Sequence, residues 1–226
     1  MRINKLLSNY GICSRTDANR LIQESRIIVN GKLCITGQWV EMEDTILIDN
    51  EPISMKDRIY IALNKPVGIT CTAEKTVESN IISFMNYPEY IFPVGRLDKA
   101  SQGLILMTND GDLANNILES ENKHEKEYIV TVNKHFDESF LKGMSKGVQI
   151  SSGNTRPCKV SRVSENIFRI ILTQGLNKQI RRMSKAFGYT VVRLDRIRII
   201  NIKIDEIDIG MWRHLTEKEV MELRNS

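Results

Sequence analysis

The sequence contains few of the residues that build metal centres and disulfide frameworks. Four cysteines (Cys13, Cys34, Cys71 and Cys158) and three histidines occur among its 226 residues, and no two cysteines form a Cys-x-x-Cys pair. A structural zinc site is therefore not expected, and a disulfide framework even less. The pattern favours free thiols in a reducing compartment, and we assign no residue as a metal ligand.

Long apolar stretches are missing as well. The chain has no run of 18 or more apolar residues, so we expect no membrane span. The opening Met-Arg-Ile-Asn-Lys lacks the apolar segment of a secretory signal. Hydrophobic residues make up 41% and charged residues 27%, which is ordinary for a globular protein. We therefore expect a cytoplasmic protein, with a monomer as the default state.

The net charge of +4 hides an uneven distribution. Residues 156–198 hold eleven Lys or Arg but only two acidic residues, Glu165 and Asp195, which leaves +9. Residues 1–34 hold six basic residues against two acidic ones. Two basic segments on a nearly balanced chain predict that one face binds a polyanion. The alternative, from charge alone, is a solvated surface with acidic partners nearby in space.

The first 34 residues have the pattern of two helices followed by a hairpin. Apolar side chains in residues 3–10 follow the i, i+3, i+4, i+7 spacing of a helix, and Gly11 ends it. Ser14 begins a second helix, with Asp17 as a capping partner. Asn30-Gly31 between two apolar runs is the strongest short signal for a β-hairpin.

A polar segment at residues 49–58 separates this region from a larger one rich in strands. Strands are predicted at 59–63, 104–108, 128–132 and 168–172, with short helices between them, one of them capped by Asp112. Because the helices are interspersed irregularly, we expect an α+β fold with a mixed, mostly antiparallel sheet, not a doubly wound one. The expected domains are 1–52 and 57–226.

Asp98 stands in the segment with the most chemical interest. Residues 95–104 read Gly-Arg-Leu-Asp-Lys-Ala-Ser-Gln-Gly-Leu, a polar turn that leads into a buried strand. Such turns place side chains at the lip of a rigid sheet, where function is often found. Taken alone, the segment equally fits a surface turn closed by an Arg96–Asp98 ion pair.

This segment closely resembles the signature of the ribosomal pseudouridine synthases, Gly-Arg-Leu-Asp-x-x-Ser/Thr-x-Gly-Leu. Residues 64–68, 126–128 and 174–183 resemble three further motifs of that family, in the family's order. Residues 2–34 resemble the S4-like RNA-binding module that precedes the catalytic domain in the branch acting on ribosomal RNA. The sequences of residues 124–128 and 174–177 are most similar to those of the F-type enzymes that act on the large subunit.

The resemblance implies a reaction that breaks the C1′–N1 bond of uridine and rejoins the uracil through C5, without a cofactor. Asp98 is then the catalytic carboxylate, as a nucleophile at C1′ or as a base at the C2′ proton. Arg181 is its cationic partner, which a carboxylate in a dry site requires. Tyr128 stacks on the uracil, with a core aromatic as the alternative.

Other roles follow from the same resemblance. A uridine inside folded RNA must leave its stack, and Arg96 is the candidate to fill the gap. Leu194 resembles the apolar residue beneath the base, although ordinary core packing is the competing interpretation. The predicted RNA-binding residues are Lys5, Arg15, Arg26, Lys32, Lys178, Arg182 and Lys185. The implied partner is ribosomal RNA, with 23S as the expected substrate and transfer RNA as a second candidate.

Two other functions remain open at this stage. A ribosome assembly factor without catalysis would use the S4-like module and the basic segment but would not need Asp98, Tyr128 and Arg181. A nucleic-acid glycosidase would release the base and needs two carboxylates. The nearest pair to Asp98, Asp110 and Asp112, fits a turn and helix cap better than an acid–base pair.

Overall fold

The chain begins with two short helices, as the sequence predicts. The computed structural model describes residues 1–74 and 76–226. Helix α1 (Ile3–Asn9) buries Ile3, Leu6 and Leu7. Helix α2 (Arg15–Gln23) is capped by Ser14, whose Oγ accepts a hydrogen bond from the backbone N–H of Asp17 at 3.0 Å.

A small antiparallel sheet follows, in the order β2-β1-β3-β4. Its strands are β1 (Ile27–Val29), β2 (Lys32–Leu33), β3 (Ile46–Ile48) and β4 (Glu51–Pro52). Asn30 and Gly31 join β1 to β2 with φ of 50° and 76°, and these two successive positive φ angles fit a type I′ turn, so the predicted hairpin is confirmed. One apolar cluster, from Ile3 to Ile46, holds α1, α2 and this sheet together.

The larger sheet has the order β11-β12-β8-β13-β7-β5-β15. Its strands are β5 (Tyr60–Lys65), β7 (Gln102–Thr108), β8 (Lys126–Val132), β11 (Lys159–Arg162), β12 (Ile167–Leu172), β13 (Val191–Ile199) and β15 (Trp212–His214). Strands β6 (Phe92–Val94) and β14 (Ile202–Lys203) pair with β7 and β13. Strands β13 and β7 run parallel, and the other pairs of this sheet run antiparallel. The predicted α+β fold with a mixed, mostly antiparallel sheet is confirmed.

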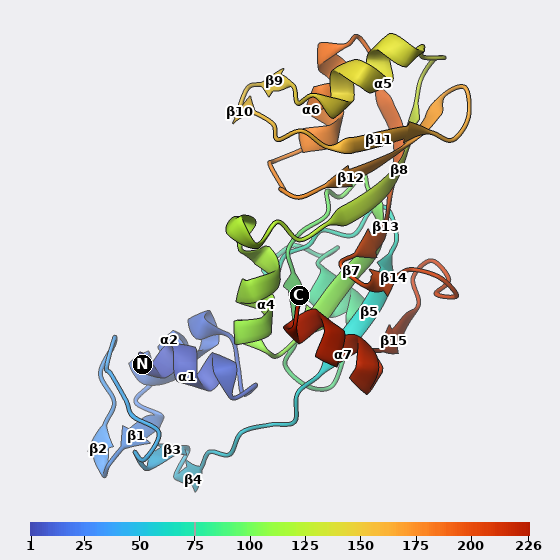
Figure 1. Cartoon of the computed structure of the whole chain (residues 1–226). Helices are drawn as coiled ribbons and strands as arrows, with labels where there is room; N and C mark the ends of the chain where they lie inside the picture. Colours follow the sequence, from blue (N-terminus) through green and yellow to red (C-terminus); the bar gives the residue numbers. More distant parts are fainter. Residues whose placement is uncertain (75) are drawn as a thin grey trace.

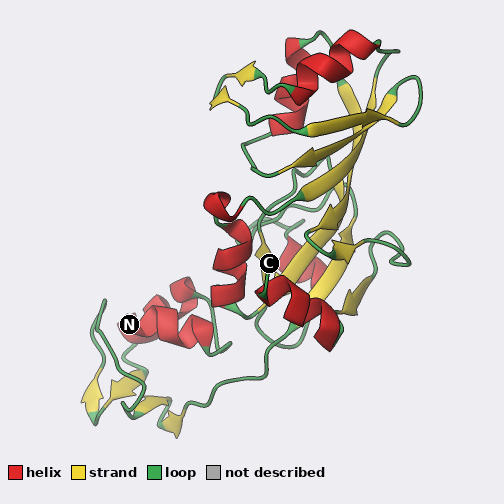
Figure 2. Ribbon diagram, viewed as in Figure 1, coloured by secondary structure: helices red, strands yellow, loops and turns green. Residues whose placement is uncertain are grey.

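Helices cover both faces of this sheet, because its central strands are apolar on both sides. Ile61 and Leu63 of β5 belong to one buried cluster, whereas Ala62 between them belongs to another. The first cluster includes residues of α3 (Ile81–Met85), α5 (Glu138–Ser145) and α6 (Gln179–Ala186), and the second includes residues of α4 (Gly111–Leu118) and α7 (Glu217–Arg224). Figure 2 shows α4 and α7 beside β5 and β7, and α5 and α6 at the far end of the sheet.

One predicted helix cap is wrong. Asp110, not Asp112, caps α4, and its Oδ1 accepts a hydrogen bond from the N–H of Leu113 at 3.1 Å. The reason is that β7 ends at Thr108, so the chain already turns into the helix at Asp110 and Asp112 falls in the first helical turn. Thr216 and Glu219 form a capping box at the start of α7.

The small sheet and its helices contact the rest of the chain through α1 and α4, which lie side by side in Figure 1. Arg58 links the end of α1 to the segment before α4, because its Nη1 donates to the carbonyl oxygens of Asn9 at 2.5 Å and Asn109 at 3.3 Å. Within the two described stretches of chain, no helix has the length and apolarity that a bilayer span requires.

Candidate active site

Asp98 lies in the turn between β6 and β7, and three neighbours hold this turn in place. The N–H of Ser101 donates to the Asp98 carbonyl at 2.9 Å, and the N–H of Gly68 donates to the Lys99 carbonyl at 2.8 Å. Leu97 is buried and its N–H contacts the Sγ of Cys71 at 3.3 Å. The Asp98 side chain itself remains 32% exposed, so the carboxylate faces an opening instead of the core.

That opening is a cavity of about 730 Å³ between the Asp98 turn, the strands β8, β12 and β13, and the start of α6. Among the described residues that line it, Asp98 is the only carboxylate. Seven basic residues share the lining: Arg96, Lys99, Lys126, Arg156, Lys178, Arg181 and Arg196. A cavity with this charge balance suits an anionic ligand whose reacting centre meets one carboxylate.

Arg181 joins α6 to the Asp98 turn. Its Nη1 donates to the carbonyl of Val191 at 2.9 Å, and its Nη2 donates to the Ala100 carbonyl and the Ser101 hydroxyl at 3.0 and 3.1 Å. Its Nε lies 3.9 Å from Asp98 Oδ2, and both side chains are partly buried. The predicted Asp98–Arg181 neighbourhood is therefore present, and the guanidinium is fixed by backbone groups while it faces the carboxylate.

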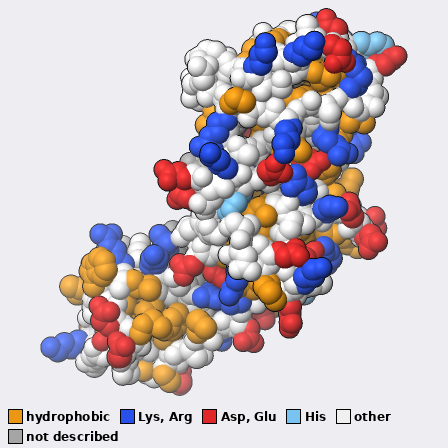
Figure 3. Space-filling model, viewed as in Figure 1, with side chains coloured by type: hydrophobic (Ala, Val, Ile, Leu, Met, Phe, Trp, Pro, Cys, Tyr) orange, Lys and Arg blue, Asp and Glu red, His pale blue; other side chains and the backbone are white. Residues whose placement is uncertain are grey.

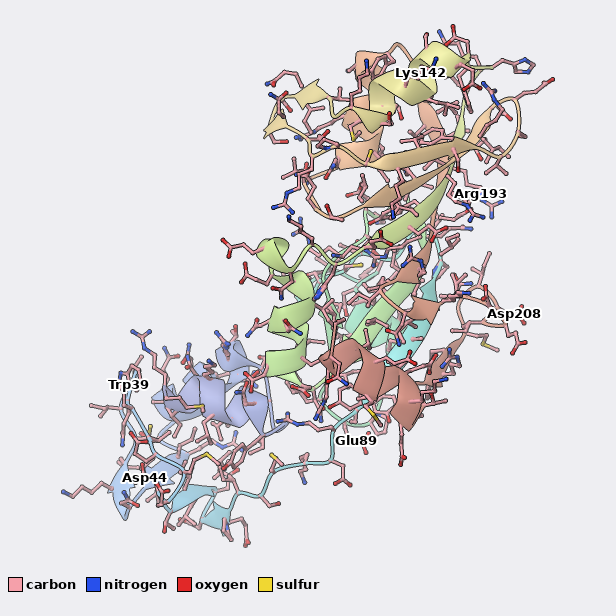
Figure 4. All side chains as sticks on the ribbon, in the orientation of Figure 1. Trp39, Asp44, Glu89, Lys142, Arg193 and Asp208 are labelled. Atoms are coloured by element: carbon pink, nitrogen blue, oxygen red, sulfur yellow. The ribbon has the colours of Figure 1, made fainter. Side chains whose placement is uncertain are left out.

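Tyr128 and Leu194 line the same cavity from neighbouring strands. Tyr128 is 8% and Leu194 6% exposed, and both also belong to the main apolar cluster. Each side chain therefore packs in the core and also borders the cavity, while its predicted contact with the uracil stays a prediction. Arg193 and Asp195, which alternate with Leu194, pair with each other at 2.7 Å, and Figure 4 shows Arg193 extending outward from β13.

Arg96 is exposed and borders the cavity mouth. Asp98 has its ion pair with Arg181, and none of the described acidic residues forms a salt bridge with Arg96. The arrangement expected of a simple Arg96–Asp98 surface turn is thus absent from the described chain. Lys178 lines the cavity and Lys185 is exposed on α6, whereas Arg182 donates to Asn177 Oδ1 at 2.9 Å.

None of the four predicted RNA-binding residues of the first 34 residues lines the cavity: Lys5 lies on α1, Arg15 on α2, Arg26 between α2 and β1, and Lys32 on β2. Figure 1 shows α1, α2 and the small sheet at one end of the molecule. Arg15 and Lys32 are exposed, and Lys5 is partly buried. Arg26 differs from them because Asp49 and Glu24 already bind its guanidinium, at 2.5 and 3.2 Å. These hydrogen bonds raise the pKa of Arg26 and leave less of its charge for a phosphate.

Sequence reasoning missed three basic residues of the site: Lys65, Lys126 and Arg196. Lys65 is fully buried, lies close enough to Asp98 and Arg196 to feel their charges, and donates to the carbonyls of Pro66 and Ile69 at 2.8 and 2.9 Å. Burial lowers the pKa of Lys65, and burial together with the charge of Arg196 lowers the pKa of Lys126 to about 8. The available signal was the strand alternation, which places Arg196 on the same face as Leu194.

Gly103 makes the close approach of β7 and β13 possible. Its φ is +110°, and an added Cβ would overlap the carbonyl oxygen of Arg196 and lie 2.6 Å from its nitrogen. Gly153 has nearly the same φ, +109°, with open space around it. We expect Gly103→Ala to lower the free energy of unfolding by about 2–4 kcal/mol more than Gly153→Ala, because only the former adds a steric clash. Urea unfolding of both variants measures this, and equal losses would contradict it.

Comparisons with known proteins agree with this geometry. Residues 59–186 match the family described as RNA pseudouridylate synthase, and residues 1–46 match the S4 domain. The chain is 48% identical to the Dual-specificity RNA pseudouridine synthase RluF of Escherichia coli (strain K12), over 99% of this chain and 78% of that protein. It is 31% identical to the Ribosomal large subunit pseudouridine synthase B of Bacillus subtilis (strain 168), over 99% and 95% of the two chains.

A solved structure titled as a crystal structure of pseudouridylate synthase has the same architecture. It superposes with a TM-score of 0.73 at 28% identity and covers 99% of both chains. The resemblance that the motifs predict is thereby confirmed over nearly the whole chain. The chain belongs to the RNA pseudouridine synthase family, as an enzyme that carries an S4 domain in front of its catalytic fold.

Proposed function

We propose that this enzyme converts a uridine of large-subunit (23S) ribosomal RNA to pseudouridine, with Asp98 as its catalytic carboxylate. The name of the E. coli relative supports RNA as the substrate, and the name of the B. subtilis relative supports the RNA of the large ribosomal subunit. The observation that carries the proposal is the cavity: one carboxylate, a guanidinium 3.9 Å from it, and a lining otherwise rich in basic side chains.

Each proposed role matches a position in this cavity. The uridine leaves its stack and enters beside Tyr128 and Leu194, while Arg96 at the mouth fills the gap in the RNA. Asp98 then acts at the ribose, either on C1′ or on the C2′ proton, and Arg181 keeps it charged. No step in this sequence needs a cofactor, and we propose that a monomer carries it out.

The geometry favours isomerisation over base release. A glycosidase activates water with a second carboxylate at about 5–9.5 Å from the first. Asp98 is the only carboxylate among the described lining residues. Asp110 accepts hydrogen bonds from Leu113 N–H and Tyr60, and it therefore serves α4 and not the cavity.

We propose that residues 1–52 form the RNA-binding domain and residues 57–226 the catalytic domain. Arg15 and Lys32 are exposed on the first, and Lys178 and Lys185 lie on or near α6 of the second, where Arg182 has a local partner. Basic side chains on both domains would bind RNA phosphates on either side of the target uridine. Since the E. coli relative is named dual-specificity, we propose transfer RNA as a second substrate class.

Arg15 and Arg26 allow a matched test of RNA binding. Arg15→Gln should weaken binding and lower the slope of log K against log salt by about 1, because one phosphate contact is lost. Arg26→Gln should change the slope less, since Asp49 and Glu24 already neutralise Arg26. Filter binding at several salt concentrations measures both, and single-turnover conversion of saturating RNA should stay within about twofold of the wild type. A larger slope change for Arg26→Gln would contradict this assignment.

The substrate class is tested with transcripts that carry no modification. Large-subunit rRNA, small-subunit rRNA and transfer RNA are incubated with the protein, digested to nucleosides and separated by chromatography. Pseudouridine in the large-subunit RNA supports the proposal. Pseudouridine in small-subunit RNA alone would overturn the choice of subunit, and release of free uracil would indicate a glycosidase.

A further inference from the structure

Arg196 is buried in the cavity wall with part of its guanidinium unsatisfied. The residue is 3% exposed, and its Nε donates to the Leu104 carbonyl at 2.6 Å while Nη1 contacts the Arg96 carbonyl at 3.4 Å. Its Nη2 is buried and has no hydrogen-bond partner in the described chain. A buried cationic N–H without a partner is unfavourable, so such a group indicates a place for a ligand atom.

The neighbours of Arg196 indicate what kind of ligand atom this is. Arg196 lies directly opposite Tyr128 in the β13–β8 register, and Leu194 is two residues before it on the same face. All three line the cavity together with Leu172. An aromatic and two aliphatic side chains suit a flat ring, whereas a phosphate would be held at the exposed mouth among Arg96, Lys99 and Lys178. Nη2 is therefore placed to meet a polar atom on a ring.

Basic side chains on the two faces of β8, β12 and β13 differ in whether they have acidic partners. On one face Arg198 binds Glu127 and Glu125 at 2.6 and 2.9 Å, and Arg169 binds Glu127 at 3.2 Å. Figure 3 shows basic and acidic side chains intermixed on the visible surface around β8 and β12. On the cavity face, Lys126 and Arg196 have no salt-bridge partner in the described chain.

Lys126 and Arg196 also act on each other. Burial and, after it, the charge of Arg196 lower the pKa of Lys126 to about 8, so the two cations lie close enough to repel. Burial and the charge of Arg196 also lower the pKa of Lys65. Among the described residues that line the cavity, only Asp98 can offset the positive charge of its inner wall, and negative charge on a bound ring would relieve it.

We propose that Arg196 donates a hydrogen bond through Nη2 to a carbonyl oxygen of the target uracil and, with Lys126, stabilises the negative charge that this ring gains when its bond to ribose breaks. The inference rests on the proposed function and deepens it, because it assigns the leaving ring its own stabilising residues. Asp98, kept charged by Arg181, acts on the ribose side of the same bond.

The negative charge on the ring follows from where the electrons of the broken bond go. When the C1′–N1 bond breaks, its electron pair stays on the ring, which becomes a uracil anion with charge spread over its carbonyl oxygens. The ring then turns, a C1′–C5 bond forms from the ring's electrons, C5 loses its proton and N1 gains one. A donor that is fixed before the reaction stabilises the anion more than the neutral ring, and so lowers the barrier to bond breaking.

The test varies the donor and the leaving ring together. Arg196→Lys keeps a charge and a donor for Leu104, which protects folding, but it cannot hold two carbonyls and reach the ring at once. Its single-turnover rate on uridine RNA should fall about 10²-fold with RNA affinity nearly unchanged. On the same RNA with 5-fluorouridine at the target, the loss should be about tenfold or less, because fluorine makes the departing ring a more stable anion. Disappearance of the nucleoside from digested RNA measures both rates.

Two further variants keep the test decisive. Lys126→Met removes the second cation without touching Leu104 or Arg96, and it should show a smaller loss with the same dependence on fluorine. If urea unfolding shows that Arg196→Lys is not properly folded, the rates of Lys126→Met on the two substrates decide whether the inference holds. Arg198→Lys is the matched control on the opposite face, and its losses on the two substrates should be equal.

Equal losses on uridine and 5-fluorouridine RNA for both Arg196→Lys and Lys126→Met would overturn the inference and leave them structural roles. In that case the wild type would still make pseudouridine, so the proposed function would stand. If the wild type changes neither nucleoside in an RNA that it binds, the proposed function itself fails.

Discussion

Asp98→Asn should bind RNA as tightly as the wild type and lose its single-turnover rate of pseudouridine formation by about 10⁴-fold or more. The amide has nearly the same size as the carboxylate, so the turn between β6 and β7 should keep its shape. It can neither attack C1′ nor remove the C2′ proton, and no other carboxylate among the described lining residues can replace it. Quenched-flow sampling with analysis of digested RNA measures the rate.

Asp112→Asn is the matched control for that experiment. Asp112 lies in the first turn of α4 and contacts Asn9 at 3.4 Å, outside the cavity lining. Its rate should remain within about twofold of the wild type, as expected for a surface substitution. An Asp98→Asn protein that kept a tenth of the wild-type rate would remove Asp98 from the centre of the mechanism.

Arg181→Lys should lower the single-turnover rate by about 10²-fold or more. The guanidinium of Arg181 binds Val191, Ala100 and Ser101 while its Nε faces Asp98. A lysine keeps the charge and has three N–H donors, but they all diverge from one nitrogen. They cannot reproduce the hydrogen bonds that two separate guanidinium nitrogens make to β13 and the Asp98 turn while Nε faces the carboxylate. RNA affinity should change by no more than about threefold, because the charge near the RNA is unchanged.

Arg169→Lys provides the comparison for Arg181→Lys. Arg169 lies on β12 and binds Glu127 on the face away from the cavity, so its replacement tests the general effect of an Arg-to-Lys change. Its rate should stay within about twofold of the wild type. If Arg181→Lys were as active as Arg169→Lys, the guanidinium of Arg181 would not be required beside Asp98.

Local signals predicted the parts of the fold that depend on neighbours in the chain. Asn30-Gly31 specified the hairpin because the turn needs two positive φ angles, and Ser14 specified a helix start through a hydrogen bond three residues away. The Asp98 turn was identified from its motif. Helix α5 was missed although Asp137 caps it, since its short apolar pattern does not separate helix from strand.

Features that depend on distant residues could not be predicted in this way. Arg26 meets Asp49 across the small sheet, a pairing 23 residues apart that reduces its value as a phosphate ligand. Arg196 faces the cavity because β13 pairs in parallel with β7 and antiparallel with β8, and this order of strands is set by the whole sheet. The same long-range packing buries Lys65 and Lys126 and shifts their pKa values.

The measurement that tests the account most directly maps pseudouridine, by a chemical stop to reverse transcription, in large-subunit rRNA that lacks the modification. Wild type and Asp112→Asn should each produce a new stop at one uridine, and Asp98→Asn should produce none while it binds the RNA equally well. A stop of equal strength with Asp98→Asn would contradict the central role of Asp98. Tight binding by all three proteins without any stop, on naked RNA and on assembly particles, would instead identify a factor that acts by binding alone.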